Sequence, residues 1–155
     1  MAVSPDASHI VAASSGATSV EIWDANFPGN SETSTYYSGP TNVVLCVAWS
    51  PDGTFLAAGS ADATVIIWDA TSGMPLTIFS IPTGSVLALS WSPDSKRLAS
   101  ASDDGIVRVW SMKEENILFT YTGHNGPVRS VAWSPDGHSI ASAGDDMTVQ
   151  IWGAP

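Results

Sequence analysis

Short runs of apolar and β-branched residues alternate with polar turns along the chain, and this alternation predicts strands. Typical runs are VVLCVAW, FLAAGS, TVIIW and LTIFS, which have the β-branched and aromatic composition of strands. No run keeps a helical periodicity over several turns. Several runs are apolar at almost every position, which favours sheets buried on both faces over a sandwich with one wet face. The pattern predicts an all-β fold of stacked sheets.

The same pattern of strands and turns recurs four times. The aligned segments are SPDASHIVAASSGATSVEIWDA from Ser4, WSPDGTFLAAGSADATVIIWDA from Trp49, WSPDSKRLASASDDGIVRVWSM from Trp91 and WSPDGHSIASAGDDMTVQIWGA from Trp133. Two sets of tryptophans repeat every 42 residues: Trp49, Trp91 and Trp133, and Trp68, Trp110 and Trp152. Trp23 precedes Trp68 by 45 residues, and the additional length lies in the polar segment NFPGNSETST, as expected of a loop insertion.

Each copy has room for four strands, which is the size of one propeller blade. The inner strand ends at Trp-Ser, the second near an Asp-containing turn and the third at the second Trp, and a fourth strand follows. We therefore predict a β-propeller segment of four-stranded antiparallel blades, four in this chain, at residues 1–39, 40–84, 85–125 and 126–155. The first blade would have a shortened inner strand, and the last would lack its outer strand.

Four sequence motifs in register resemble those of the WD-repeat β-propeller family. They are IWDA at Ile22–Ala25 and Ile67–Ala70, VRVWS at Val107–Ser111, VQIWG at Val149–Gly153 and the pair Gly123-His124. The resemblance covers nearly the whole chain. Ser-Pro-Asp-Gly also occurs in TolB-like propellers, but the Trp that ends each third strand favours the WD-repeat class. Arrays as regular as this one resemble bacterial modules attached to signalling proteins, including kinases.

The resemblance implies a buried, hydrogen-bonded tetrad of Trp, Ser or Thr, Asp and His in each blade. By motif position the fourth copy has all its members, namely His124, Ser142, Asp146 and Trp152. The third copy keeps Ser100, Asp104 and Trp110, with Pro82 at the His position. The second copy keeps Asp62 and Trp68, with Ala58 and Pro40, and the first keeps only Trp23, with Ala13 and Ala17. The copies with incomplete tetrads are expected to rely on apolar packing.

A segment of four blades leaves three arrangements open. It could be part of a longer propeller, it could form an eight-bladed ring with a second copy, or it could close on itself as a strained four-bladed ring. Exposed blade faces and strand edges would favour association in the first two cases.

Composition and charge narrow the function classes. The net charge is −10, from 15 acidic residues against 5 Lys and Arg, which disfavours nucleic acid and anionic membranes as partners. No apolar stretch reaches the ~18 residues of a membrane span, and the N-terminus lacks the features of a signal peptide. Cys46 is the single cysteine, so a thiolate metal cluster is excluded. We expect a cytoplasmic location and no cofactor or metal.

Residues that could suggest chemistry have a simpler structural explanation. The turns at 102–105 and 144–147 are rich in Asp, but Asp is common in tight turns and the spacing of a calcium loop is missing. His124, Ser142 and Asp146 have the composition of a catalytic triad, yet no nucleophile elbow surrounds the serine. His9 and His138 are expected at the surface, and Cys46 in the core. We therefore expect that the protein is not an enzyme.

The leading hypothesis is a non-catalytic scaffold that binds proteins or peptides. In WD-repeat propellers, partners often dock on the loops that enter the inner strands and on the turns between the second and third strands. The matching positions are Val43, Leu45 and Ala61; Ser85, Leu87 and Asp103; and Pro127, Arg129 and Asp145. The alternatives are a self-assembling unit that builds an eight-bladed homodimer and, from other propellers, an enzyme or ligand-binding domain.

Overall fold

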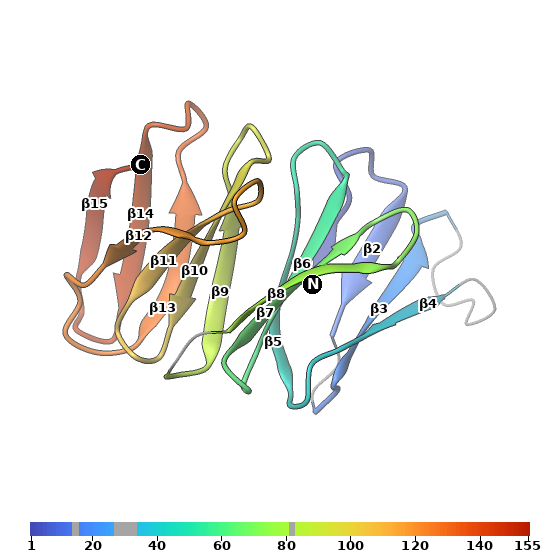
Figure 1. The fold of residues 1–155 in the computed structure, drawn as a ribbon, viewed down its shortest axis with the longest axis horizontal. Helices are drawn as coiled ribbons and strands as arrows, with labels where there is room; N and C mark the ends of the chain where they lie inside the picture. The colour runs from blue at the N-terminus through green and yellow to red at the C-terminus, as the bar shows by residue number, and fades with distance from the viewer. Residues whose placement is uncertain (14–15, 27–33, 81–82) are drawn as a thin grey trace.

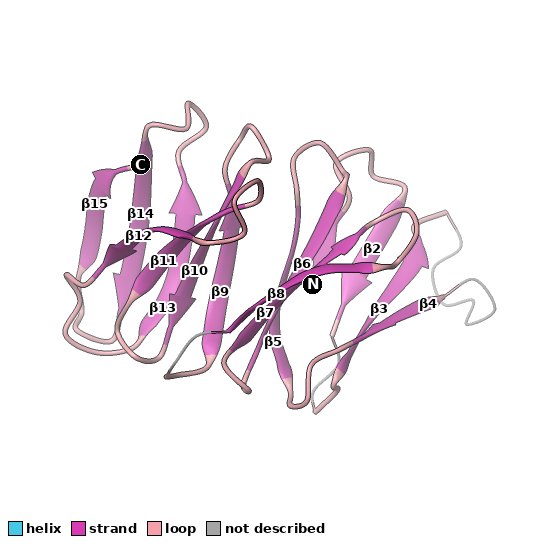
Figure 2. Cartoon of the chain, viewed as in Figure 1, coloured by secondary structure: helices cyan, strands magenta, loops and turns pink. Residues whose placement is uncertain are grey.

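The computed structural model describes residues 1–13, 16–26, 34–80 and 83–155, and all regular structure in these ranges is strand (Figure 2). The first two sheets are formed by β1 (Ala2–Val3), β2 (His9–Ala12), β3 (Ser19–Asp24) and β4 (Thr35–Ser38), then β5 (Val44–Trp49), β6 (Phe55–Ser60), β7 (Thr64–Asp69) and β8 (Pro75–Ser80). The other two are formed by β9 (Val86–Trp91), β10 (Arg97–Ser102), β11 (Val107–Ser111) and β12 (Ile117–Tyr121), then β13 (Val128–Trp133), β14 (Ser139–Gly144) and β15 (Val149–Gly153).

Within each sheet, strands that are consecutive in the sequence pair in antiparallel fashion. Three sheets have four strands, and the last has three. The inner strand of the first sheet, β1, is only 2 residues long. Both features follow from the motif positions, so the prediction of an all-β propeller segment is confirmed.

The sheets stack face to face in chain order, with β1–β4 at one end of the series and β13–β15 at the other (Figure 1). The chain therefore forms an open series of blades rather than a closed four-bladed ring. A separate apolar core fills the space between each pair of neighbouring sheets. Fully buried members of these cores include Val11, Leu56, Ile66 and Trp68 in the first, Val65, Ile67, Val86 and Leu98 in the second, and Val107, Val109, Val128 and Ile140 in the third. Burial on both sheet faces explains why the central strands are almost continuously apolar.

In the second, third and fourth sheets, the tryptophan near the end of the third strand is covered by an aromatic ring from the outer strand of the preceding sheet. The ring centroids are 6.0 Å apart for Tyr37 and Trp68, 4.5 Å for Phe79 and Trp110, and 4.6 Å for Tyr121 and Trp152. The last two pairs are stacked, with interplanar angles of 19° and 8°. Such pairs stabilise an interface beyond the area that they bury, so the tryptophan repeat is a repeat of inter-sheet contacts.

The turn between the second and third strands needs a left-handed residue in every copy that is fully described. That residue is Ala63 (φ 66°), Gly105 (φ 83°) or Met147 (φ 61°). Only glycine adopts this conformation without a steric cost from Cβ. The fourth copy therefore contains backbone strain at Met147.

Met147→Gly is expected to raise the free energy of unfolding by about 1 kcal/mol. The substitution removes the backbone strain, and this gain exceeds the cost of the higher conformational entropy that glycine gives the unfolded chain. The side chain of Met147 is 96% exposed, so its loss removes almost no packing. Urea unfolding followed by far-UV circular dichroism measures the effect. Gly105→Ala is the matched reverse change: it should destabilise, because its Cβ would also lie 3.1 Å from the carbonyl oxygen of Gly126. A loss of stability in Met147→Gly would contradict the strain argument.

Candidate functional site

His124 lies at the centre of a buried hydrogen-bond network in the fourth sheet. Its Nε2 is 2.8 Å from Ser142 Oγ, and its Nδ1 is 2.9 Å from Asp146 Oδ2. The His124 side chain is fully buried. Asp146 also accepts bonds from the backbone of Asn125 and from Thr148, and these bonds hold the pKa of its carboxyl well below the usual range. The network ties the loop before β13 to the turn after β14.

Trp152 lies beside this network without a hydrogen bond to it. The resemblance implied that Ser142 would accept a bond from the indole N–H, but Trp152 Nε1 is buried and has no partner among the described residues. Two aromatic contacts position the ring instead: it stacks on Tyr121 and lies 5.5 Å from Phe119. Of the four residues, the structure therefore joins three by hydrogen bonds and places the fourth by packing.

The third sheet replaces the histidine by a buried arginine. Trp110 Nε1 donates to Ser100 Oγ at 2.8 Å, which is the bond that the fourth sheet lacks. Asp104 bonds Arg108 Nη2 at 2.8 Å, and both side chains are almost fully buried. Arg108 was missed by the sequence reasoning. Its signal was a cation in the third strand of a copy that lacks the histidine, at the position where the second copy has Ile66.

Asp62 in the second sheet bonds to the loop before the inner strand, as Asp146 does in the fourth sheet. It accepts bonds from the backbone N–H and hydroxyl of Thr41 at 2.6 and 2.8 Å. Partial burial opposes ionisation, but hydrogen bonds from Thr64 and Thr41 prevail and lower the pKa of Asp62 to about 2. Trp68 is fully buried and Trp23 half-buried. The equivalence proposed for Pro82 lies outside the described residues.

The nine residues expected to bind partners lie at or just before the start of the inner strands β5, β9 and β13 and in the turns after the second strands. In three sheets a backbone bond joins the residue before the inner strand to the turn after the second strand. The bonds run from Ala61 N to Val43 O at 2.9 Å, from Asp103 N to Ser85 O at 3.1 Å, and from Asp145 N to Pro127 O at 2.8 Å. Each predicted group of three is therefore brought together on its own blade.

A β-bulge places the central member of each group. Val44 and Cys46 pair with Ser60 and Gly59, which leaves Leu45 without a partner in the register. Leu87 and Arg129 are bulged at the same position of β9 and β13. A bulge re-aims a side chain and is over-represented next to functional sites. We call the surface formed by these three residues and the six beside them the bulge face.

The bulge face combines apolar and charged groups. Leu45 is 44% exposed and Leu87 half-buried. Arg129 donates to Asp145 through Nε at 2.9 Å and through Nη2 at 2.5 Å. This bidentate bond raises the pKa of Arg129, as does the charge of Asp103, and it lowers the pKa of Asp145. Both partners are exposed, so the pair adds little stability.

The remaining candidates give no sign of chemistry. Burial raises the pKa of the Cys46 thiol to about 12, so a thiolate is not available. No group of three or more His, Cys, Asp or Glu residues in the described ranges is arranged to hold a metal ion. The described residues also contain no helix long and apolar enough to cross a membrane.

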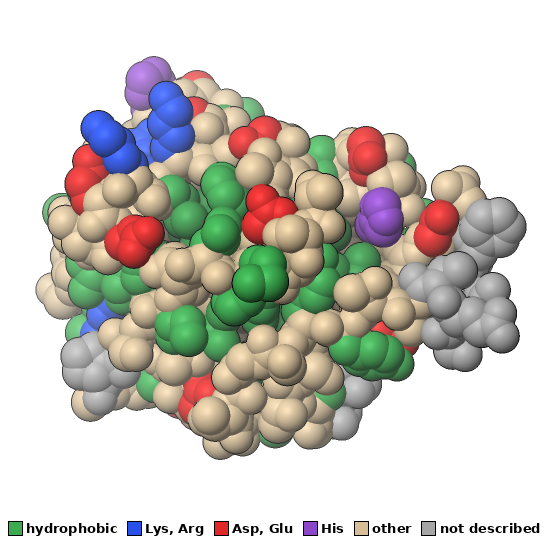
Figure 3. Space-filling model, turned by 45° about the vertical axis from the view of Figure 1, so that its right-hand side comes forward, with side chains coloured by type: hydrophobic (Ala, Val, Ile, Leu, Met, Phe, Trp, Pro, Cys, Tyr) green, Lys and Arg blue, Asp and Glu red, His purple; other side chains and the backbone are tan. Residues whose placement is uncertain are grey.

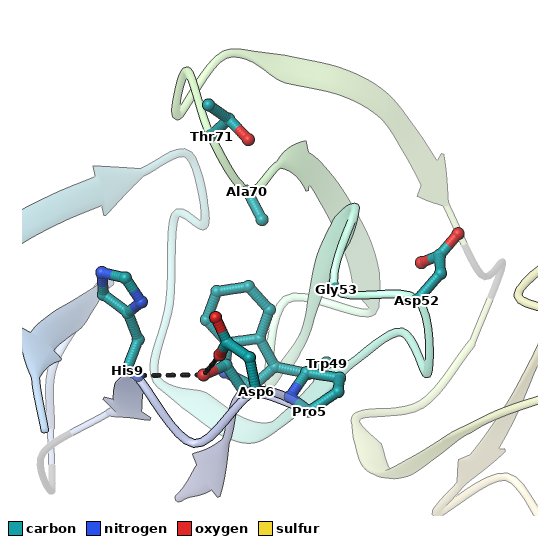
Figure 4. A pocket seen from close by; sticks show the side chains of 9 residues that line it. Pro5, Asp6, His9, Trp49, Asp52, Gly53, Ala70 and Thr71 are labelled. Carbon is teal, nitrogen blue, oxygen red and sulfur yellow. Dashed lines mark hydrogen bonds between the residues drawn. The ribbon is translucent and has the colours of Figure 1, made fainter.

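A cavity between the first two sheets is lined by turns and hairpins. Its volume is about 400 Å³, and its walls include His9, Trp49, Ala70 and Thr71 (Figure 4). The backbone N–H of His9 donates to Ser4 Oγ at 2.9 Å (dashed in Figure 4), so the hairpin beneath the imidazole is held in place. Ser4 donates to Asp6 at 2.6 Å, and the Nδ1 of His9 lies 2.6 Å from Ser8 Oγ. These contacts join near neighbours within one hairpin.

Comparison with known proteins agrees with the geometry. The family described as "WD domain, G-beta repeat" matches residues 30–69, 73–111 and 115–153, which is well over half of the chain. The chain is similar to Protein Mut11 of Chlamydomonas reinhardtii, with 58% identity over 36 residues, 23% of this chain and 10% of that protein. It is similar to a Notchless protein homolog of Arabidopsis thaliana, with 51% identity over 39 residues, 25% of this chain and 8% of that protein.

A third relative is the small ribosomal subunit protein RACK1y of Oryza sativa subsp. japonica. It is 38% identical over 58 residues, which are 37% of this chain and 16% of that protein. The matches thus span a small part of each relative, so the relatives' own roles do not transfer directly. The repeated motifs, the stacked four-stranded sheets and the matched residues together place this chain in the WD-repeat family of β-propellers.

Proposed function

We propose that this chain is a non-catalytic scaffold whose bulge face binds a protein or peptide. Proteins of the WD-repeat family commonly serve as interaction scaffolds, and the relatives found here are WD-repeat proteins. The observation that carries the proposal is the recurrence of a β-bulge at the same position in three adjacent blades. In this proposal, Leu45, Leu87 and Arg129, the residues at the three bulges, contact the same partner.

The chemistry of this row suits a peptide or loop of a partner protein. The two leucines offer apolar area, while Arg129 can bind a carboxylate and the exposed carboxylates of Asp103 and Asp145 can bind a cation or backbone N–H groups. The net charge of −10 supports a protein partner over nucleic acid or an anionic membrane. A cytoplasmic location is part of the proposal. No catalytic step is proposed, because the Ser142–His124–Asp146 network is buried.

The test is a triple variant, Leu45→Ser, Leu87→Ser and Arg129→Ser, compared with the unchanged protein in capture from lysate and quantified by mass spectrometry. Partners that bind this face are expected to fall by about tenfold or more, because central apolar and Arg contacts dominate interface energies. The matched control is Leu76→Ser with Ile78→Ser. Both residues lie on the outer strand β8 and are exposed at 48% and 57%. Capture that is unchanged in the triple variant, or reduced equally in the control, would remove the bulge face as the docking site.

A second candidate function is self-assembly through the last sheet, and the exposed face of β15 favours it. Val149 and Ile151 are 71% and 73% exposed on one side of this strand, while Trp152 on the other side contacts the third sheet through Tyr121. Each of the three interfaces between neighbouring sheets buries an apolar core. The exposed face of β15 has the same apolar character but no neighbouring sheet among the described residues. We propose that it packs against a sheet of a second copy to give an eight-bladed homodimer, with further blades of a longer propeller as the other occupant.

Sedimentation velocity distinguishes these occupants. A dimer that persists on dilution and becomes a monomer in Ile151→Asp supports the homodimer. A monomer at all concentrations overturns self-assembly and leaves the longer propeller. The control Ile78→Asp, on the outer strand β8, should not change the sedimentation of the protein.

A further inference from the structure

A second cavity lies between the second and third sheets, at the opposite ends of the strands from the bulge face. Its volume is about 600 Å³, larger than the cavity between the first two sheets. Phe55, Met112 and Leu118 supply its apolar lining, and Phe55 is fixed by stacking on Trp91 at 5.8 Å. Both walls belong to complete four-stranded sheets. The cavity therefore does not depend on what adjoins the first or the last blade.

Three of the five basic residues of this acidic chain line that cavity. Arg108 is buried against Asp104, and Arg129 is paired with Asp145 on the bulge face. The other three are Lys96, Arg97 and Lys113, all at the cavity. On the face drawn in Figure 3, most of the visible Lys and Arg surface gathers at the upper left, where Asp and Glu side chains lie beside it. The cavity thus brings together most of the positive charge of a chain whose net charge is −10.

The two lysines are the unengaged members of this group. Arg97 lies 4.7 Å above the Trp133 ring and 3.7 Å from Asp94. Lys96 and Lys113 are exposed and form no ion pair within the described ranges. Their ammonium groups are therefore free to bind an anionic ligand.

Three carboxylates line the same cavity, and each is held by a neighbouring hydroxyl. Ser50 donates to Asp52 at 2.6 Å, Ser92 donates to Asp94 at 2.5 Å, and Ser111 donates to Glu114. The first two bonds belong to the repeated Ser-Pro-Asp hairpin and serve its fold. The lining thus carries three acidic and three basic side chains, and Lys96 and Lys113 are the basic ones that form no ion pair among the described residues.

The repeat itself provides an internal comparison. The cavity between the first two sheets (Figure 4) has Ala70 and Thr71 where the second cavity has Met112 and Lys113. The residue 42 positions before Lys96 is Thr54. Because the strand order is the same in both repeats, these side chains give the second cavity its larger apolar lining and its two lysines.

We propose that the cavity between the second and third sheets binds a short peptide segment in which an apolar side chain neighbours carboxylates. The apolar side chain would pack on Phe55, Met112 and Leu118. The carboxylates would bind Lys96 and Lys113, whose charges also attract an acidic segment that the rest of the surface repels. This inference is independent of the bulge face, because the two surfaces lie at opposite strand ends and share no residue.

The test begins with an array of all hexapeptides composed of Asp, Leu, Phe and Gly, probed with the unchanged protein. Binding is expected for peptides that contain both Asp and an apolar residue. Fluorescence anisotropy on the strongest such peptide then compares variants. Lys96→Ser with Lys113→Ser is expected to weaken binding by about tenfold, as the loss of two exposed charge contacts predicts. Leu118→Ser should weaken it without a change of charge.

The matched control is Thr54→Glu with Thr71→Glu, which gives the same net charge as the double lysine variant at the equivalent positions of the preceding repeat. It should leave the affinity within about twofold, because long-range repulsion between exposed charges is screened by salt. Far-UV circular dichroism verifies that each variant is folded. The triple bulge-face variant should bind the peptide normally. The proposal is overturned if no mixed peptide binds, if peptides of Asp and Gly alone bind as well, if oligothymidylate competes better than the peptide, or if both double variants lose affinity equally.

Discussion

Asp104→Asn is expected to lower the free energy of unfolding by about 3 kcal/mol, because it leaves the buried guanidinium of Arg108 without a countercharge. Arg108 is only 6% exposed, and its bond to Asp104 measures 2.8 Å. The asparagine oxygen can still accept the bond from the backbone N–H of Ile106, so the turn itself should survive. Urea unfolding followed by far-UV circular dichroism measures the loss.

Two further variants separate the charge effect from a general defect. Asp103→Asn makes the same chemical change one residue earlier, at an exposed position, and should be nearly neutral. Arg108→Ile places at this position the residue type that the second sheet has at Ile66. Combined with Asp104→Asn, it should recover most of the lost stability, since a well-packed apolar replacement of a buried ion pair is often neutral or better. A double variant as unstable as Asp104→Asn alone would show that the ion pair is not the cause.

Trp110→Phe is expected to cost about 2–4 kcal/mol, whereas Trp152→Phe should cost about 1 kcal/mol. Trp110 is 3% exposed, donates to Ser100 and stacks on Phe79. Its replacement loses packing and leaves the Ser100 hydroxyl unpaired. Trp152 is less buried, and its N–H has no partner among the described residues to lose. The difference in unfolding free energy between the two variants therefore measures the combined effect of the indole hydrogen bond and of burial.

Unfolding of both variants should be followed by far-UV circular dichroism at one protein concentration, because association would alter the apparent stability. Ser100→Ala provides the complementary measurement. It keeps the Trp110 packing but removes the acceptor, and it should cost about 1–3 kcal/mol. Equal losses for Trp110→Phe and Trp152→Phe would mean that the indole bond contributes nothing.

The strands and their stacking could be predicted because the sequence repeats the same signals at constant spacing. Three of the four inner strands end at a tryptophan followed by Ser-Pro-Asp, and every third strand has a tryptophan near its end. The same strand assignment therefore had to fit all four copies. The pairing partner of each strand could also be predicted, because strands that are consecutive in a blade pair with one another. The short β1 and the three-stranded last sheet were predicted from the same alignment.

Side-chain partners inside the repeat were harder to predict. The motif places Trp152 and Ser142 at matching positions, but stacking on Tyr121 fixes the indole elsewhere, and such a contact crosses between sheets. Arg108 occupies a position where other copies have Glu21, Ile66 or Gln150, so the repeat carried no rule for it. The β-bulges were also hidden, because a bulge that recurs in each copy leaves the 42-residue spacing unchanged.

The aromatic covering of each third-strand tryptophan gives the stack a direction. Tyr37, Phe79 and Tyr121 each belong to the earlier blade, while the indoles that they cover belong to the later one. During synthesis from the N-terminus, the covering residue is therefore made before the tryptophan that it covers. This order allows blades to be added one at a time, because each new indole can pack on an aromatic residue that has already been synthesised.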